Sequence, residues 1–314
     1  MSKASIVIRC YNEEQHIGRL LSGILEQTIR DVEIILVDSG STDATLSIAS
    51  RYPVTIAFIA PEEFSFGRSL NLGCAKATGE FIVIASAHIY PLYKDWLEKL
   101  LEPFKIPEVA LVYGKQRGNE TVKYSEHQIY KKWFPDVSTN LQKNPFCNNA
   151  NAAIRRSIWE HMPYNEELTG LEDLDWAKRV TELGKKIAYS VEAEIVHVHN
   201  ETPLTIYNRY KREAIAFKRI YPHERFNIWD FIKLLTANVI TDYYHSWQDR
   251  MFFRNLTGIP MYRLMQFWGT FRGYAKHGFI SQQLRNHFYY PNGLSRKSVD
   301  RKIEKERLID YEHH

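Results

Sequence analysis

Ser86, Ala87 and His88 directly follow an apolar run at residues 81–85. That run is rich in β-branched residues and has no polar alternation, which is typical of a strand covered on both faces in a parallel sheet. Open α/β sheets usually bind ligands at the carboxyl ends of their strands. We therefore expect the hydroxyl of Ser86 and the imidazole of His88 to lie at a ligand site.

Other groups able to do chemistry also lie at the ends of expected elements. Asp38 follows a second apolar run, the pair Glu172-Asp173 opens a helical pattern, and His197 and His199 close a short apolar segment. Such groups move protons, accept hydrogen bonds or coordinate metals. Each also has a structural explanation, because short acidic residues cap loops and the helix dipole favours carboxylates at a helix start.

The elements that position these residues alternate between strand and helix. The expected strands are 5–9, 33–37, 54–59, 81–85 and 109–113, and the expected helices between them are 13–27, 41–49, 68–77 and 93–104. A helix at 172–183 precedes two short strands at 187–189 and 195–198. This alternation predicts an α/β fold with a doubly wound, mostly parallel sheet.

Composition is typical of a folded protein. The 314 residues are 44% hydrophobic and 25% charged, enough for a large core. Three cysteines form no disulfide framework, and no secretory or membrane-spanning pattern stands out, so we expect a cytoplasmic protein, with contact at the inner face of the membrane left open.

Charge is uneven along the chain. After residue 205 there are 19 Lys and Arg against 10 Asp and Glu, and this basic part is also rich in aromatic residues. The combination suits an anionic membrane surface or an acidic acceptor. We expect no nucleic-acid partner, because no zinc-finger or RNA-recognition pattern is present.

Four motifs in order resemble the family 2 glycosyltransferases of the GT-A fold. They are Ser5-Ile-Val-Ile-Arg-Cys-Tyr-Asn-Glu13, Val37-Asp-Ser-Gly-Ser-Thr-Asp43, Gly79-Glu-Phe81 and Gly170-Leu-Glu-Asp-Leu-Asp-Trp-Ala-Lys-Arg179. Tyr113-Gly-Lys-Gln116 and residues 148–172 further resemble the rhamnosyltransferase-like branch that builds bacterial polysaccharides. The resemblance implies a transferase domain at residues 1–204, followed by a helical region at 205–314.

The resemblance also implies a nucleotide-sugar donor and the residues that bind it. Asp38 accepts a hydrogen bond from the base, Tyr11 lies against the base, and Glu13 touches the ribose or base. Cys10 belongs to the same strand end. Arg68 is placed to bind phosphate oxygens, although it is equally well explained as a solvated arginine at a helix start. Asp43 we interpret as a loop cap.

For catalysis, the resemblance points to Glu172-Asp173. In an inverting transfer one carboxylate takes the proton of the acceptor hydroxyl as that hydroxyl attacks the anomeric carbon. Adjacent helical residues point in different directions, so we expect only one of the two to reach the acceptor. We choose Asp173 as the base.

Ser86-Ala87-His88 departs from the family, whose Asp-X-Asp motif holds Mg²⁺ or Mn²⁺ against the diphosphate. Three explanations remain open. His88 and a later histidine bind a softer ion, for which we choose His199 because residues alternate along a strand and His197 would face away. Alternatively, Arg68, His88 and backbone amides replace the metal, or catalysis has been lost.

The last hundred residues are interpreted from pattern alone. Expected helices at 203–221, 228–244 and 261–274 carry aromatic and basic residues, and a charged helix is expected at 297–307. Internal packing or a homodimer explains this pattern better than peripheral contact with a membrane.

The expected function is inverting transfer of a sugar to a hydroxyl of a glycan or a lipid-linked acceptor, in the synthesis of bacterial surface polysaccharide. The alternatives are a metal-independent transferase that uses a nucleoside-monophosphate sugar and a catalytically silent sugar-binding homologue.

Overall fold

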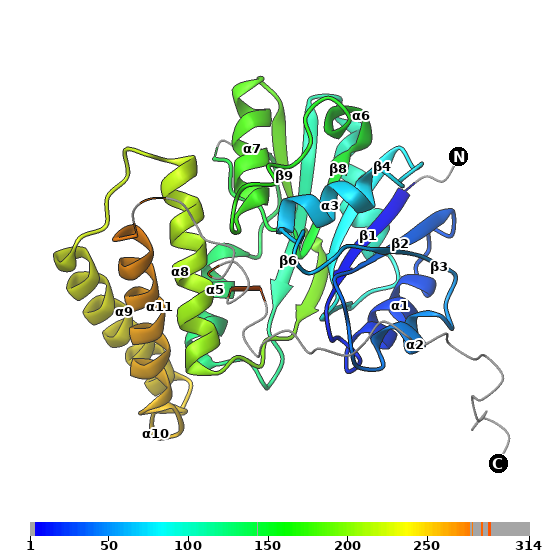
Figure 1. Cartoon of the computed structure of the whole chain (residues 1–314). Coiled ribbons are helices and arrows are strands. Elements are labelled where there is room, and N and C mark those ends of the chain that lie inside the picture. The colour runs from blue at the N-terminus through cyan, green and yellow to red at the C-terminus, as the bar shows by residue number, and fades with distance from the viewer. Residues whose placement is uncertain (1–3, 143, 277, 279–283, 285–287, 290–314) are drawn as a thin grey trace, which may run out of the picture.

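The computed structural model describes residues 4–142, 144–276, 278, 284 and 288–289. In this part of the chain nine strands form one sheet with helices on both faces, and helices from the last third stand beside it (Figure 1). The strand order is β3-β2-β1-β4-β8-β6-β9-β5, with β7 paired to β9. The strands are β1 (Ala4–Cys10), β2 (Val32–Asp38), β3 (Val54–Phe58), β4 (Phe81–Ser86), β5 (Ile89–Pro91), β6 (Val109–Arg117), β7 (Thr139–Gln142), β8 (Asn151–Arg155) and β9 (Lys186–His197).

The N-terminal half of the sheet is parallel, which confirms the predicted doubly wound α/β fold. β1 pairs with β2 on one side and with β4 on the other, and β2 pairs with β3. The register places Cys10 opposite Asp38 and Arg9 opposite Ser86. The polar residues of three strands therefore reach the same edge of the sheet, as a ligand site at the carboxyl ends requires.

The other half of the sheet is mixed. β8 is antiparallel to both β4 and β6, β9 is parallel to β6, and β5 and β7 are antiparallel to β9. β9 is one strand of 12 residues, where two short strands were expected. Between the pairs Gly114–Ser190 and Gln116–Ile195, β6 advances two residues and β9 advances five, so β9 carries a bulge of three extra residues.

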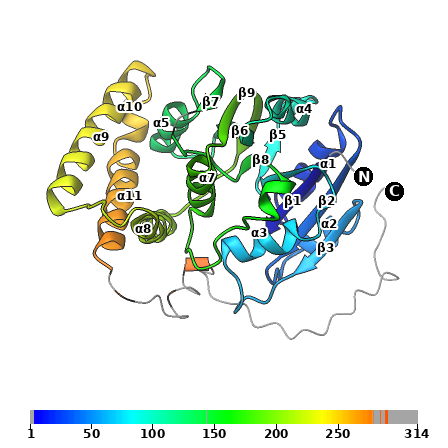
Figure 2. The same cartoon turned by 90° about the horizontal axis from the view of Figure 1, so that it is seen from above.

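Two apolar cores lie on opposite faces of the sheet. α1 (Ile17–Leu25), α2 (Thr45–Ala49) and α4 (Trp96–Leu101) pack on one face, while α3 (Phe66–Cys74), α5 (Tyr124–Trp133) and α7 (Glu172–Glu182) pack on the other (Figure 2). α1 begins at Ile17, four residues later than expected, because residues 13–16 form a turn. α6 (Arg156–Trp159) and a 3-10 turn (Glu102–Lys105) complete this part of the chain.

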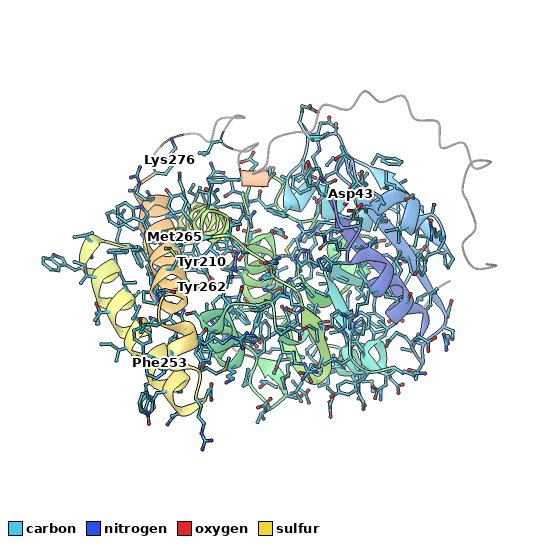
Figure 3. All side chains as sticks on the ribbon, turned by 90° about the horizontal axis from the view of Figure 1, so that it is seen from below. Asp43, Tyr210, Phe253, Tyr262, Met265 and Lys276 are labelled. Atoms are coloured by element: carbon cyan, nitrogen blue, oxygen red, sulfur yellow. The ribbon has the colours of Figure 1, made fainter. Side chains whose placement is uncertain are left out.

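In the described ranges up to residue 276, the sheet is followed by α8 (Pro203–Ile220), α9 (Ile228–Gln248), α10 (Phe252–Asn255) and α11 (Gly258–Tyr274). α8 and α11 pack at close range because Gly269 and Gly273 face α8, where a Cβ on either glycine would lie 2.5–2.6 Å from a backbone oxygen. Tyr210, Tyr262 and Met265 lie along this contact (Figure 3). The buried ion pair between Arg263 and Asp242, at 2.7 Å, ties α11 to α9.

The outer face of α9 is apolar and exposed. Trp229, Ile240 and Trp247 are 74%, 62% and 65% exposed, and Phe253 of α10 is 82% exposed. Internal packing, which we expected of this helix, therefore holds for its inner face alone. Within the described residues no helix combines the length and apolarity needed to cross a bilayer. The expected helix at 297–307 lies outside the described residues.

Candidate active site

A cleft of about 830 Å³ opens at the carboxyl edge of β1 and β4 and continues past the end of β9. Its walls come from the loop after β1, the turn after β4, the start of α7, the segment after β9 and one face of α8. Several predicted site residues line it: Glu13, Ser86, His88, Glu172, Asp173 and His199. Three loops and two helices thus bring together residues nearly 190 positions apart.

The start of α7 presents its two carboxylates differently. Leu171, just before the helix, has a left-handed backbone (φ 56°), a conformation that is uncommon for a leucine and helps to set the direction of the first turn. The carboxylate of Glu172 is buried and forms an ion pair with Arg9 at 3.0 Å. Glu172 is therefore already paired within the protein.

Asp173 faces the cleft. Its Oδ2 accepts a hydrogen bond from the backbone N–H of Asn149 at 3.1 Å, and its Oδ1 accepts one from Leu174. Burial, together with the nearby charge of Glu172, raises the pKa of Asp173 from 3.8 to about 7. A carboxyl with a pKa near neutrality can take up a proton during a reaction and release it again.

His88 lies in the turn between β4 and β5 and contacts the loop after β1. Its Nδ1 lies 2.8 Å from Oε1 of Glu13, and its Nε2 lies 3.1 Å from the hydroxyl of Ser86. Burial opposes the charged form of His88, but Glu13 outweighs burial and raises the pKa of the imidazole. Ala87 packs in the core and is not among the residues that line the cleft.

His197 and His199 lie beside His88, and one prediction about them was wrong. We expected alternation along the strand to turn His197 away from His199, but residues two apart in a strand lie on the same face, and β9 ends at His197. Their ring centroids are 4.1 Å apart, and His197 stacks on His88 at 5.0 Å. All three histidines therefore form one cluster on the cleft wall.

The residues predicted to hold the nucleotide base lie deeper at the sheet edge. Asp38 is only 1% exposed, and its Oδ2 accepts hydrogen bonds from the backbone N–H groups of Gly40 and Ser41. Its Oδ1 lies 3.5 Å from the Cys10 thiol, whose pKa is raised by burial and by Asp38. Tyr11 is half-buried beside them. In this structure the Asp38 carboxylate supports its own loop, and its role toward a base stays a prediction.

Arg68 does not reach the cleft. It lies in the first turn of α3 with 48% of its side chain exposed, and it contacts Glu63 at 3.6 Å and Glu166 at 3.9 Å on the surface. Asp43 accepts hydrogen bonds from the backbone of Thr45 and of Glu14. The structural explanations of both residues match these contacts: a solvated arginine at a helix start and a loop brace.

Sequence reasoning missed the contribution of α8. Arg209, Arg212 and Glu213 all line the cleft. Arg212 stacks over the Phe66 ring at 4.6 Å, Arg9 stacks over the same ring at 4.8 Å, and the Arg212 Nε is buried without a hydrogen-bond partner among the described residues. The spacing i, i+3, i+4 was the available signal, because it places the three residues on one helix face. The division at residue 204 stays a prediction.

A second cavity, of about 450 Å³, adjoins the cleft and is here called the aromatic pocket. Asp173, His197 and His199 line both cavities. The aromatic residues of the pocket come from α5 and the residue after it, the loop before β8, α8, the segment before α9, and α11: Tyr130, Trp133, Phe134, Phe146, Tyr210, Phe217, Phe226 and Tyr274. Asp173 therefore stands where a polar cleft meets an apolar one.

Comparisons with known proteins agree with this architecture. The sequence matches the family model "Glycosyl transferase family 2" over residues 5–162. It is 34% identical over 197 residues to the O-antigen chain rhamnosyltransferase WbaN of Salmonella anatum, covering 59% of this chain and 62% of that protein. It is 31% identical over 221 residues to the O-antigen chain rhamnosyltransferase RfbN of Salmonella typhimurium, covering 66% and 70%.

Solved structures share the fold at low sequence identity. The mannosyltransferase PcManGT of Pyrobaculum calidifontis, in complex with GDP-Man and Mn²⁺, has a TM-score of 0.57 and 17% identity over 92% of this chain and 87% of that one. TarS of S. aureus, residues 1–349 with UDP-GlcNAc, has a TM-score of 0.53 and 14% identity over 86% and 90%. These likenesses show the shared fold, and the match to the family model over half of the sequence shows that this chain belongs to the family 2 glycosyltransferases.

Proposed function

We propose that this chain transfers a sugar from a nucleotide-sugar donor to a hydroxyl of a glycan or lipid-linked acceptor, with inversion, in the synthesis of a bacterial surface polysaccharide. The observation that carries the proposal is the position of Asp173. This carboxyl has a raised pKa and lies where the cleft and the aromatic pocket meet. The names of the two Salmonella relatives support the polysaccharide class.

The donor binds in the cleft, with its base toward the ends of β1 and β2. Cys10, Tyr11 and Asp38 lie at that edge. Arg212 is the group best placed for the donor phosphates, because it lines the cleft and its Nε is buried without a partner among the described residues. A guanidinium binds phosphate oxygens through paired N–H groups. The two structural neighbours hold different nucleotides, so the proposal names the nucleotide sugar as a class.

The reaction is a single displacement. The acceptor hydroxyl attacks the anomeric carbon, its proton passes to Asp173, and the bond to the donor phosphate breaks as the nucleotide leaves with the electron pair. Attack opposite the leaving group inverts the configuration. Glu172 does not take the proton in this scheme, because its carboxylate is already paired with Arg9. Arg212 meets the charge that develops on the leaving phosphate.

The acceptor approaches through the aromatic pocket. Phe217, Phe226 and Tyr274 line it, and these rings belong to α8, to the segment before α9 and to α11. Aromatic faces suit the apolar face of a sugar ring or a lipid chain, and Asp173 at the inner end would meet the acceptor hydroxyl. This assigns the C-terminal helices to the acceptor.

The family implies a divalent metal at the donor phosphates. Ser86-Ala87-His88 offers no carboxylate, so an all-oxygen Mg²⁺ site does not fit, whereas His88, His197 and His199 each offer a ring nitrogen within 4.8 Å of the others. A metal bound there would neutralise phosphate charge on the leaving group. The residues present therefore fit a metal ion that prefers nitrogen ligands to oxygen ligands.

The exposed apolar face of α9 and α10 supports peripheral contact with a membrane, where a lipid-linked acceptor would lie. Trp229, Trp247 and Phe253 are exposed on it, and the exposed cations Arg250 and Arg254 are close to Trp247 and Phe253 in the sequence. Sedimentation with vesicles that contain anionic lipid tests this contact. A stable dimer in size-exclusion chromatography with light scattering, without vesicle binding, would instead assign the face to a second copy of the chain.

A screen of UDP-, GDP-, dTDP- and CMP-sugars tests the function as a whole. Each donor is incubated with and without an acceptor glycan, and with and without EDTA, and the product anomer is assigned by NMR. We expect turnover with a nucleoside-diphosphate sugar and inversion at the anomeric carbon. Turnover with the CMP-sugar alone would favour the monophosphate alternative. Saturable glycan binding without any turnover would favour the silent homologue.

A further inference from the structure

The histidine cluster draws its three rings from two places in the chain. His88 lies in the turn after β4, and His197 and His199 lie at and beyond the end of β9. One ring nitrogen from each residue lies within 4.8 Å of the other two. The ring centroids are 5.0 Å apart for His88 and His197, 5.6 Å for His88 and His199, and 4.1 Å for His197 and His199. Three imidazoles at this spacing can reach one ion.

Each ring is held at its Nδ1 by a different acceptor. His88 pairs with Glu13 at 2.8 Å, His197 with the side-chain oxygen of Gln116 at 2.9 Å, and His199 with Glu126 at 2.8 Å. Carboxylate and amide oxygens only accept, so each Nδ1 carries the hydrogen, and the Nε2 of a neutral ring is left with a lone pair. Metal-binding histidines are commonly held in this way.

The acceptors are themselves fixed. Glu126 is buried and also pairs with Arg209 at 2.8 Å, and Arg209 pairs with Glu201 at 2.5 Å. The Tyr130 hydroxyl lies 3.3 Å from Nδ1 of His199, and the Ser86 hydroxyl lies 3.1 Å from Nε2 of His88. A hydroxyl rotates readily, so Ser86 does not block that nitrogen. The surrounding groups thus orient the rings before anything binds.

His197 gives the second, independent observation. Its side chain is 6% exposed, and its Nε2 is buried with no hydrogen-bond partner in the described part of the chain. Buried polar atoms are nearly always paired, and the exceptions often belong to sites that a ligand completes. The ring stacks on His88 and touches His199, so the unpaired nitrogen belongs to the cluster.

We propose that His88, His197 and His199 form a three-imidazole centre that binds a transition-metal ion of the Zn²⁺ or Co²⁺ type in preference to Mg²⁺. Imidazole is a favourable ligand for these ions, whereas Mg²⁺ prefers oxygen ligands. Three protein ligands leave one position open in a tetrahedral site. Use of that position by a donor phosphate rests on the proposed function, but binding of the metal does not.

The test measures metal binding without any sugar. The full-length protein, prepared without an affinity tag and stripped with a chelator, is titrated with CoCl₂ and followed by visible absorption. Zinc content after dialysis against ZnCl₂ is measured by elemental analysis. We expect one ion per chain, Co²⁺ bands typical of a nitrogen-ligated site, displacement of Co²⁺ by Zn²⁺, and no displacement by millimolar Mg²⁺.

Variants assign the ion to the cluster. Glu126→Gln removes a carboxylate that supports a ligand, and it should weaken Zn²⁺ binding by roughly 10–100-fold. His199→Gln removes a ligand itself, so its loss of Zn²⁺ affinity should be at least as large. Because His197 is buried, His197→Gln is interpreted only if circular dichroism shows a native fold. His223→Ala is the matched control, since His223 is exposed outside the cluster, and it should bind like the unaltered chain.

Three results would overturn the proposal: no stoichiometric Zn²⁺ or Co²⁺ in the folded protein, unchanged binding in His199→Gln, or displacement of Co²⁺ by Mg²⁺. These results are distinct from failure of the proposed function. A protein that binds zinc through the cluster but turns over no donor would retain the metal centre and reject the transferase assignment. Transfer that resists a chelator, with no ion bound, would do the reverse.

Discussion

The two sides of the cleft are built from interactions of different range. On the donor side, Asp38 binds the backbone two and three residues ahead, and Asp43 binds Thr45 and, 29 residues away, Glu14, so the bracing there is of shorter range. On the histidine side, His197 binds Gln116 and His199 binds Glu126, 81 and 73 residues away. Local bracing leaves compact motifs in a sequence, whereas long-range bracing leaves isolated residues that gain meaning only in the fold.

The largest expected effect lies where the two sides meet. Asp173→Asn removes the proton acceptor while keeping the shape of the side chain and one of its two accepted hydrogen bonds, so transfer should fall by about 10²- to 10⁴-fold. Donor affinity, measured by calorimetry, should stay within a few-fold of the original. Glu182→Gln at the far end of the same helix is the control. Near-normal turnover in Asp173→Asn would remove Asp173 from the reaction.

The next comparison sets two arginines against each other. Arg212→Gln should weaken donor binding by roughly 10–100-fold, because charge-assisted hydrogen bonds to phosphate are among the stronger ones. Arg68→Gln, on the exposed start of α3, should change donor affinity less than twofold. Donor titration of both variants decides between them. A larger loss of donor affinity in Arg68→Gln than in Arg212→Gln would place the phosphate site at Arg68, as the sequence resemblance suggested.

The dependence on pH should follow Asp173. Its pKa is raised to about 7, and a base must be ionised, so kcat/KM should fall as pH drops below 7, by up to about tenfold per unit. Stability should change in the opposite sense. The folded protein keeps this proton where the unfolded chain releases it, so the free energy of unfolding should decrease as pH rises from about 4 to 7.

Asp173→Asn tests that assignment, because it should flatten the stability change between pH 4 and 7 in urea unfolding. The same variant should leave intact any pH dependence that arises elsewhere in the chain. An unchanged profile would assign the titration to another group.

The smallest expected effect concerns the acceptor. Phe217→Ala removes one ring of the aromatic pocket and should raise the acceptor KM several-fold, since stacking on a ring contributes roughly 0.5–1.5 kcal/mol. Hydrolysis of the donor in the absence of acceptor should not change. Tyr93→Ala, at an exposed aromatic residue that lines neither cavity, is the matched control. Equal effects of both variants on acceptor KM would show that the aromatic pocket does not bind the acceptor.

The sequence allowed the parallel half of the sheet to be predicted well, because residues 81–85 and 34–37 are continuous apolar runs and the polar residues that follow them are visible. Glu172 and Asp173 were also found, but their different surroundings were not, because Arg9 pairs with Glu172 across 163 residues. Arg212 was missed for a similar reason: its partner ring, Phe66, belongs to a distant helix. Periodicity reports the face on which a residue lies but not what packs against that face.

The bulge in β9 has a consequence for which side of the sheet each of its residues meets. Ile187 and Tyr189 pack in one core, whereas Ala193 and Ile195, which also carry odd numbers, pack in the other. The bulge adds three residues, an odd number, so the side chains after it lie on the opposite face from those before it. His197, two residues after Ile195, therefore shares the face of Ala193 and Ile195. Gly114 makes room for this exchange, since a Cβ there would lie 2.2 Å from the backbone oxygen of Ala193. The position of His197 on the cleft wall thus depends on Gly114 in the neighbouring strand β6, where a side chain would collide with the bulge.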